Sequence, residues 1–368
     1  MMMKLSLICQ PLSNAACWLF HKCAGFRLTA IMLVCTILQT TWYFLPAAAQ
    51  SLSDKPHIKI LVSAPPAKSI RGLCPVSDDI VWASGTGGMV GKSTDGGQNW
   101  QWTQIRGCDS CDWRSLYAFN DKKALVLNAG EPARLFLTED GGLNWQQVFS
   151  DTTHGIFFDA IDFFNDREGI AIGDPLQNRF TIIRTHDGGK TWRHDPVATL
   201  PVATNGESLF AASGTSLVTL PGNKVYFGTG GTVSRLFTSG SSWLPLTIPI
   251  IQGSSTTGAF SIAFLNNKIG IAIGGDYKND TLTKGNCVIT IDGGHNWYTP
   301  HTPPHGFKSC VAFITPKVLV ATGTSGTDIS FNKGRDWQQA GQGFHVVKRA
   351  RNGKRIFLAG TSIGILGL

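Results

Sequence analysis

Charged side chains are scarce in this chain of 368 residues: Asp, Glu, Lys and Arg make up 15% of it, and only four residues are Glu. Hydrophobic residues make up 42%, which excludes a disordered, charge-rich polymer and leaves ample material for a core. The shortage of Glu, together with 42 Gly, favours strands and tight turns over long helices. Lys and Arg form no run with interleaved aromatic residues, so nucleic-acid binding is not expected.

Cysteine is also sparse beyond residue 49, where five remain: Cys74, Cys108, Cys111, Cys287 and Cys310. The odd number leaves at least one thiol free, and Cys108 and Cys111 form the only C-x-x-C pair. This pair is either a local disulfide or two inert thiols in a loop. Redox chemistry or a metal are the alternatives, but a zinc site would need a second pair or a His cluster nearby. We therefore expect no metal and no cofactor.

The N-terminus looks like a targeting segment. Lys4, Lys22 and Arg27 precede the apolar run "LTAIMLVCTILQTTWYFLPAAAQ", and three alanines stand before Gln50. We expect residues 1–49 to be a signal peptide, or an uncleaved membrane anchor, because the run from Leu28 to Leu45 approaches the spanning length. Either way, residues 50–368 should be periplasmic or extracellular. Removing the segment takes three basic residues from 32 and none of the 24 acids, which leaves a mild net charge of 29 − 24 = +5.

One motif recurs along the chain. "STDGGQNW" at 93–100 returns as "TEDGGLNW", "THDGGKTW" and "TIDGGHNW", with a weaker copy "SFNKGRDW" and a shortened one "TSGSSW". The closing tryptophans stand at 100, 145, 192, 243, 297 and 337, at spacings of 45, 47, 51, 54 and 40 residues. These spacings are close to the length of a four-stranded propeller blade.

The segments between the copies are typical of strands. Each contains a short inner strand ("GLCPV", "SLYAF", "AIDFF", "SLFAA", "SIAFL" or "CVAFI"), a Gly-rich second strand and a third strand that ends in the Asp-Gly-Gly turn. The last unit lacks the motif, and "HIKILVS" at 57–63 can supply its outer strand. We therefore predict an all-β, seven-bladed propeller of four-stranded antiparallel blades, closed by strands from both ends of the chain. A β-sandwich, the alternative fold, has no need for such a repeat.

The acid in the motif is best explained as structural. An Asp can accept hydrogen bonds from turn N–H groups, Gly can adopt positive φ, and the Trp can pack between sheets. A catalytic group would be needed once and not in every blade. The residues with this expected role are Asp95, Trp100, Asp140, Trp145, Asp187, Trp192, Asp292, Trp297 and Trp337.

The motif resembles the Asp-box, or BNR repeat, of sialidase-like propellers. Residues 69–330 also resemble the photosystem II assembly and stability factor family, in a bacterial subtype that includes non-photosynthetic organisms. The segments that carry this resemblance are "IRGL", "WASGTGGMVGKSTDGGQNW", "GEPARLFLTEDGGLNW", "GIAIGDPLQNRF", "GESLFAASGTS", "FGTGG", "IGGDY" and "SGTDIS". The resemblance implies an exported propeller that acts as a binding scaffold. Photosynthetic members of the family assist the assembly of a membrane complex.

Charged residues recur at the entrances of the inner strands, at the end opposite to the Asp-boxes, where propellers bind ligands. The candidate binding face consists of Arg71, Arg114, Glu131, Arg134, Asp159, Asp174, Arg179, Glu207, Asp276, Tyr277, Lys308 and His345. Such a ring suits a polar ligand or a peptide. The alternative is that these residues form salt bridges between blades or a solvated rim.

We therefore expect a non-catalytic, monomeric scaffold that binds a protein or polar ligand, such as a component of a membrane or envelope complex. The alternatives are a sialidase-type glycosidase or an oxidoreductase. The sialidase Arg-Ile-Pro signature is missing, and no C-x-x-C-H is present for haem attachment.

Overall fold

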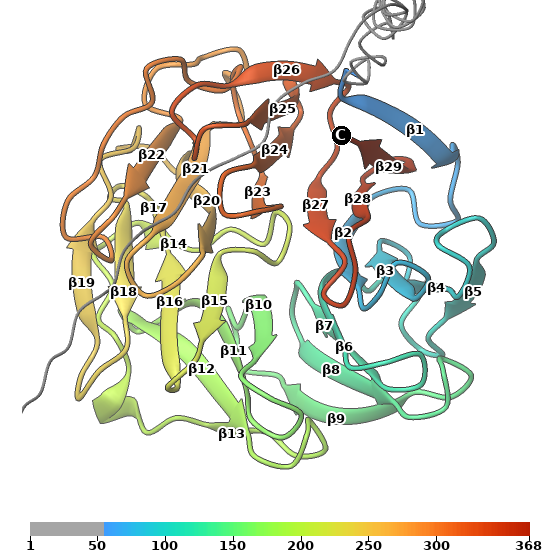
Figure 1. Ribbon diagram of the computed structural model, residues 1–368. Coiled ribbons are helices and arrows are strands. Elements are labelled where there is room, and N and C mark those ends of the chain that lie inside the picture. Colours follow the sequence, from blue (N-terminus) through green and yellow to red (C-terminus); the bar gives the residue numbers. More distant parts are fainter. Residues whose placement is uncertain (1–54) are drawn as a thin grey trace, which may run out of the picture. The chain divides into compact units, whose positions relative to one another are not determined.

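Seven antiparallel β-sheets form a closed ring in the computed structural model, which describes residues 55–368 (Figure 1). This confirms the predicted all-β, seven-bladed propeller. The predicted signal peptide, residues 1–49, lies outside the described residues. Between residues 55 and 368 the helical structure is one short 3-10 turn, η1 (Val197–Thr199), and no helix there is long and apolar enough to cross a membrane.

The first three blades follow each other along the chain, and each runs from the channel to the periphery in sequence order. Their strands are β2 (Ile70–Pro75), β3 (Val81–Gly85), β4 (Met89–Ser93) and β5 (Gln101–Gln104); β6 (Trp113–Ala118), β7 (Ala124–Asn128), β8 (Ala133–Thr138) and β9 (Gln146–Asp151); and β10 (Phe158–Phe163), β11 (Gly169–Leu176), β12 (Arg179–Thr185) and β13 (Arg193–His194).

The other blades keep this order, with changes in blades 4 and 5. Their strands are β15 (Leu217–Leu220), β16 (Lys224–Gly228), β18 (Arg235–Thr238) and β19 (Leu244–Thr247); β20 (Thr257–Phe264), β21 (Gly270–Asp276) and β22 (Cys287–Thr290); β23 (Cys310–Phe313), β24 (Leu319–Gly323), β25 (Gly326–Ser330) and β26 (Gln338–Gly341); and β27 (Val346–Arg349), β28 (Ile356–Ala359) and β29 (Ile363–Gly367).

Blade 4 corrects one detail of the sequence prediction. Its inner strand is β15 and not "SLFAA" at 208–212. That segment forms an insertion instead, and the short strands β14 (Glu207–Ser208) and β17 (Gly230–Gly231) extend the sheet of blade 5. The fourth position of blade 5 is reduced to a bridge between Ile289 and Tyr298.

The ring closes through the two ends of the described chain, as predicted. β1 (His57–Val62) pairs antiparallel with β29, from His57 opposite Gly367 to Val62 opposite Ile363. In Figure 1 the blue β1 lies beside the dark red β29. Because β1 covers the outer edge of blade 7, no long strand edge of that blade is left open.

The hydrophobic core is divided among the interfaces between neighbouring blades. Between blades 3 and 4, Phe180 packs edge-on against Phe227 and Phe237, with ring centroids 5.3 Å apart in both pairs. Between blades 1 and 2, Trp145 of the second Asp-box meets Trp82 edge-on at 6.3 Å. The repeated Trp is therefore a wedge between sheets.

The Asp-box is a hydrogen-bonded hairpin clip. Asp95 Oδ1 accepts from the backbone N–H of Asn99 at 2.9 Å, and its Oδ2 accepts from the Asn99 amide at 2.7 Å. Ser93 Oγ accepts from the Gly97 N–H at 2.8 Å, and the Trp100 indole donates to the Gly97 carbonyl at 2.9 Å. Gly96 and Gly97 have φ of 75° and 87°, which favours glycine there.

The same contacts recur at the other good copies, where Asp140, Asp187 and Asp292 each accept from the residue four positions later. In Asp95, Asp140 and Asp292, the backbone N–H of that residue and then its side-chain amide lower the pKa of the carboxyl to about 2. Their stabilising effect is therefore complete above the unfolded pKa near 4 and is lost as the pH falls through about 2.

The weaker copy has the same clip with its polarity exchanged. Asn332 replaces the Asp and accepts from the Asp336 N–H at 2.9 Å, while its amide donates to Asp336 Oδ2 at 2.8 Å. The carboxylate has moved to the other partner of the pair.

This exchange predicts a rescue experiment. Asn99→Asp places a second carboxylate where an amide now donates to Asp95 Oδ2 at 2.7 Å. We expect a lower midpoint of thermal unfolding at pH 7 because two like charges face each other. Adding Asp95→Asn should restore the midpoint, since the hairpin then matches the one at Asn332 and Asp336. This account of the clip would be contradicted if the single variant unfolded at the same temperature as the unaltered chain. It would also be contradicted if the double variant did not recover the midpoint.

Candidate functional site

Four of the inner strands carry a β-bulge near the end where they start. This end lies at the mouth of the channel that is opposite to the Asp-boxes. The register of β2, β6, β10 and β20 shifts at Arg71, Arg114, Asp159 and Phe260 respectively. A bulge leaves one residue unpaired and re-aims its side chain. The Asp-boxes lie at the opposite end of the strands, where their glycine N–H groups bond the loops that follow the inner strands, as Gly96 does to Asp79.

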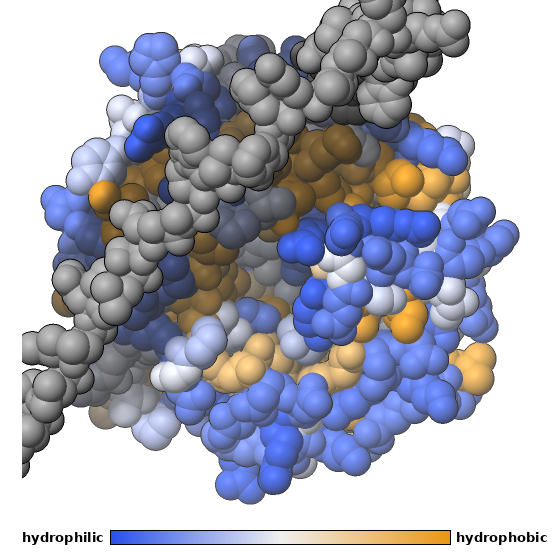
Figure 2. All heavy atoms as spheres, in the orientation of Figure 1, coloured by the Kyte–Doolittle hydropathy of each residue, from blue (hydrophilic) through white to orange (hydrophobic). Residues whose placement is uncertain are grey.

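These bulged residues meet at one cavity in the mouth of the channel. The mouth cavity has a volume of about 470 Å³, within the usual range for ligand sites. All four bulged residues line it, as do the predicted site residues Asp174, Tyr277 and His345. Figure 2 shows hydrophilic residues over most of the outside of the ring, hydrophobic residues on the inner side of several blades, and further hydrophilic residues beside the centre.

Two arginines form one side of the mouth cavity. Arg71 donates from Nη1 to the Ala212 carbonyl at 2.8 Å and forms no ion pair with a described residue. Arg114 is held by Asp112, with Nε 2.7 Å from Oδ2. Burial, and after it the like charge of Arg114, lower the pKa of Arg71 to about 10, so that Arg71 remains charged at neutral pH. This side of the cavity is suited to an anionic or carbonyl group.

Two carboxyl groups of blade 3 line the same cavity. Asp159 is 1% exposed, and neither of its oxygens has a well-formed hydrogen bond within the described residues. Asp174 Oδ1 accepts from the Leu209 N–H at 2.9 Å. Burial and then the charge of Asp174 raise the pKa of Asp159, and burial raises the pKa of Asp174 to about 6. Shifts of this kind cluster at functional sites.

The cavity has an aromatic wall, of which the sequence analysis predicted Tyr277 but missed Phe210, Phe260 and Phe307. Phe210 of the insertion stacks on Phe260 with ring centroids 3.7 Å apart, and Phe307 meets Phe260 edge-on at 4.7 Å. The ring centroids of Tyr277 and Phe260 lie 6.1 Å apart, and Tyr277 is 47% exposed. Phe210 belongs to "GESLFAASGTS", one of the segments that carry the family resemblance. The part "SLFAA" predicts a strand, which places Phe210 between sheets and not at the cavity.

Glu207 lies next to this site but does not line it. Its buried carboxylate accepts from Arg235 Nε at 2.9 Å, from the Thr229 hydroxyl at 2.6 Å and from the Thr204 N–H at 2.9 Å. These bonds hold the start of the insertion that carries Phe210. Glu207 therefore helps to hold the insertion that carries Phe210.

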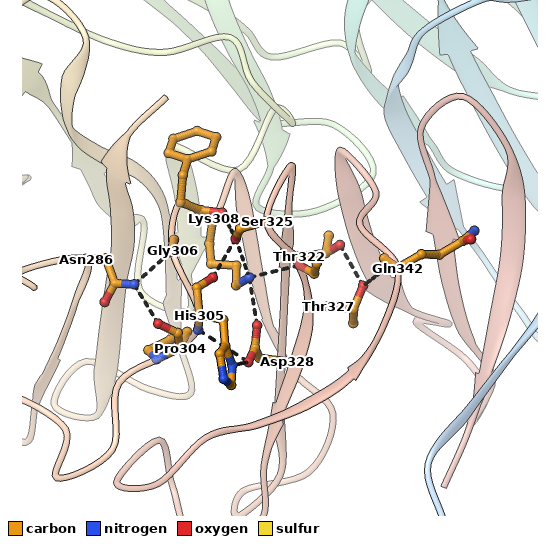
Figure 3. Close-up of polar contacts among 12 residues, drawn as sticks. Asn286, Pro304, His305, Gly306, Lys308, Thr322, Ser325, Thr327, Asp328 and Gln342 are labelled. Atoms are coloured by element: carbon orange, nitrogen blue, oxygen red, sulfur yellow. Dashed lines mark hydrogen bonds and ion pairs between the residues drawn. The ribbon is translucent and has the colours of Figure 1, made fainter. Parts of the chain in front are cut away.

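Lys308, another predicted site residue, is in a buried ion pair within blade 6 (Figure 3). Its Nζ lies 2.7 Å from Asp328 Oδ2, and both side chains are 0% exposed. Lys308 also donates to Ser325 Oγ at 2.8 Å, while His305 Nδ1 lies 2.5 Å from Asp328 Oδ1. The ammonium group of Lys308 is therefore bound within blade 6, and Lys308 does not line the mouth cavity.

The remaining predicted site residues lie outside the mouth cavity. Glu131 accepts from the Gly155 N–H, Arg134 reaches the Gly107 carbonyl, Arg179 donates to the Leu200 carbonyl, and Asp276 caps the turn at Lys278. These four residues form hydrogen bonds with nearby backbone groups and do not line the mouth cavity.

The disulfide allowed by the C-x-x-C spacing is not formed. Cys108 and Cys111 are buried free thiols, as are Cys74, Cys287 and Cys310. Burial, and after it a hydrogen bond of the Cys111 thiol with Cys108, raise the pKa of Cys111 to about 12. Within residues 55–368, no group of three or more His, Cys, Asp or Glu residues could hold a metal ion.

A second cavity, of about 360 Å³, opens at the Asp-box end of the channel and is lined by Lys348, Arg349 and Arg351. Among its polar groups, Arg349, Arg351 and Asp162 have hydrogen-bond partners in the fold, whereas the Lys348 side chain forms no hydrogen bond or ion pair with a described residue. Arg351 donates to the Ala118 carbonyl at 2.7 Å, Arg349 to the carbonyls of Ile314 and Gly353, and Thr219 donates to Asp162. The mouth cavity is the larger of the two and contains a buried carboxyl, that of Asp159, without a well-formed hydrogen bond, which makes it the stronger candidate site.

A glycine in the second strand lies against the bulge in three blades, at Gly85, Gly173 and Gly274, whereas Asn128 has this place in blade 2. In blade 3, a Cβ on Gly173 would lie 2.0 Å from the carbonyl oxygen of Phe157, just before the bulge at Asp159. The recurring "G-x-A-x-G" pattern therefore ends in a glycine because the bulged backbone approaches it closely.

We predict that Gly173→Ala will lower the free energy of unfolding by about 1–3 kcal/mol, since the bulge must move to admit the methyl group. Gly240→Ala is the matched control, because a Cβ there has nothing nearer than the Ser242 carbonyl oxygen at 3.5 Å. Urea unfolding measures both variants. Equal stability of the two would show that the bulge does not depend on Gly173.

The fold and the site together define a seven-bladed propeller with a charged and aromatic cavity in one mouth of its channel. No protein-family model and no curated protein matches the sequence. Solved structures are similar to it. YCF48 bound to D1 peptide is 17% identical with a TM-score of 0.59, and the match covers 86% of this chain and 97% of that one.

YCF48 from Cyanidioschyzon merolae is also 17% identical, with a TM-score of 0.58 and coverage of 84% and 98%. A GH74 xyloglucanase from Xanthomonas campestris is 14% identical, with a TM-score of 0.53 and coverage of 82% and 51%. At such identities the likeness shows the fold alone.

Proposed function

We propose that this chain is a non-catalytic scaffold that binds a segment of a partner protein in the mouth cavity. The observation that carries the proposal is the convergence of bulged side chains from four blades on one cavity with opposite charges and an aromatic wall. Such a surface offers anchors for both polar and apolar groups of a peptide. The structure of YCF48 bound to D1 peptide supports peptide binding as a use of this fold.

The cellular setting belongs to the same proposal. With a signal segment at residues 1–49, the propeller acts in the periplasm or outside the cell, as a monomer. Its partner is then a component of a membrane or envelope complex, and the chain assists the assembly or stability of that complex.

The pair Asp159 and Asp174 is the one observation that favours the alternative, a glycosidase. Both oxygens of Asp159 are inaccessible to solvent, so this carboxyl cannot reach a glycosidic bond without rearrangement. Glu207, the other carboxylate near the cavity, is bound to Arg235. We therefore favour binding over hydrolysis.

The test is capture of partner proteins from membrane extracts of the source organism by the immobilised chain. Arg71→Ala/Arg114→Ala removes two charges from the mouth cavity. Arg167→Ala/Arg335→Ala removes two from exposed sites at the Asp-box end and is the control. Because each charged hydrogen bond contributes roughly 1.5–3 kcal/mol, we expect binding more than about 100-fold weaker in the first variant. A partner captured equally by both folded variants would contradict the proposal.

A further inference from the structure

The mouth cavity contains two carboxyl groups, those of Asp159 and Asp174, that form no ion pair with a described residue. Asp159 and Asp174 stand on adjacent strands of blade 3, each at a shift in strand register, so that both are directed out of the ladder into one cavity. Asp174 Oδ2 has no hydrogen bond from a described residue, and Asp159, behind it, has no well-formed bond at all. Buried carboxyl groups in proteins are normally paired or hydrogen-bonded.

The arginines of the cavity do not neutralise this pair. The charge of Arg114 acts on Asp159, but the Arg114 Nε is already bound to Asp112 Oδ2 at 2.7 Å. Arg71 donates to a carbonyl. Neither Asp159 nor Asp174 therefore has an ion-pair partner among the described residues.

An aromatic surface adjoins the pair. Phe210, Phe260, Phe307 and Tyr277 line the same cavity as Asp174. Aromatic faces attract cations and cover the carbon chain to which a cation is attached. A carboxylate beside such a surface is suited to an ammonium or guanidinium group on an apolar stem.

We propose that Asp174, with Asp159 behind it, forms a subsite for an organic cation, the Lys or Arg side chain of the bound segment, whose stem lies on the aromatic wall. This inference rests on the proposed function and adds to it the charge and shape of one ligand group. The mouth cavity then binds a segment with a positive side chain at the Asp174 end and an anionic or carbonyl group at the Arg71 end.

The subsite makes cation binding dependent on pH. The other charged or titratable groups around it are Arg71, Arg114, Asp112, His345 and Tyr277. Burial and then the charge of Arg71 lower the pKa of His345 to about 4, so His345 stays neutral between pH 5 and 7. Because burial raises the pKa of Asp174 to about 6, ionisation of the pair increases over this range. Cation affinity should increase with it.

The experiment is calorimetric titration of the full chain with 2-phenylethylammonium and with its neutral analogue 2-phenylethanol. We expect the cation to bind at least 10-fold more tightly than the alcohol at pH 7. Asp174→Asn should abolish this preference. Asp276→Asn should retain it, since Asp276 caps a turn outside the cavity. Equal binding of the two probes, or a preference that survives Asp174→Asn, would overturn the proposal.

A second measurement covers the case in which Asp174→Asn does not fold. In the unaltered chain the preference for the cation should fall at least several-fold between pH 7 and pH 5, and a preference independent of pH would overturn the proposal. Neither titration uses a partner protein. If the chain shows no preference for the cation but partner capture still depends on Arg71 and Arg114, this subsite alone is rejected. If partner capture does not depend on Arg71 and Arg114, the proposed function is rejected.

Discussion

Replacing Lys308 with methionine should lower the free energy of unfolding by about 3–5 kcal/mol, the usual cost of removing one partner from a buried ion pair. Methionine keeps the length of the side chain but leaves Asp328 without the ammonium group that lies 2.7 Å from Oδ2. His305, half-exposed at 2.5 Å from the other oxygen, can offset only part of this loss. Urea unfolding at pH 7 measures the effect.

The matched control is the double variant Lys308→Met/Asp328→Asn, in which no buried charge remains. We expect it to recover about half of the lost stability, because a neutral amide can keep the hydrogen bond to His305. A loss below about 1 kcal/mol in the single variant, or no recovery in the double variant, would show that the pair in Figure 3 is not a structural element of blade 6.

Removal of β1 should have an effect of similar size. The strand pairs with β29 from His57 to Val62, and Ile58 and Val62 pack on the hydrophobic core between blades 7, 1 and 6. At about 1 kcal/mol for each ladder hydrogen bond, a chain that starts at Ser63 should lose on the order of 5 kcal/mol. It should also aggregate, because the edge of β29 becomes exposed.

A chain that starts at Pro56 is the control, since it keeps β1 entire. A synthetic peptide of residues 56–63 should restore the thermal transition of the shorter chain when added in excess, by pairing with the open edge. If the two chains unfold at the same temperature, the two termini do not close the ring.

The fold was predictable because its signal is periodic. The Trp and Asp-Gly-Gly positions recur at blade length, and "HIKILVS" remained as the one strand available to complete blade 7. The inner strand of blade 4 was misplaced because "SLFAA" has the composition of a strand. In the structure, Glu207 and Arg235 hold this segment as an insertion, and their pairing across 28 residues leaves no local pattern in the sequence.

The site was predictable only in part, for the same reason. Arg71, Arg114 and Asp159 occupy matching positions before their blades and lie together at the cavity. Lys308 occupies such a position too, but Asp328, twenty residues further along the chain, draws it into a buried pair. Phe210 and Phe260 could not be distinguished from core residues, since an aromatic side chain in a strand is usually packed between sheets.

Hydrogen–deuterium exchange of the chain with and without a captured partner tests the central claim most directly. The account predicts slower exchange at the start of the inner strands, around residues 69–72, 112–115 and 157–160, and in the insertion at 207–212. It predicts no change at the Asp-box hairpins, such as residues 93–100. Protection of the hairpins with unchanged exchange around the mouth cavity would contradict the claim that this propeller binds its partner at the mouth of the channel.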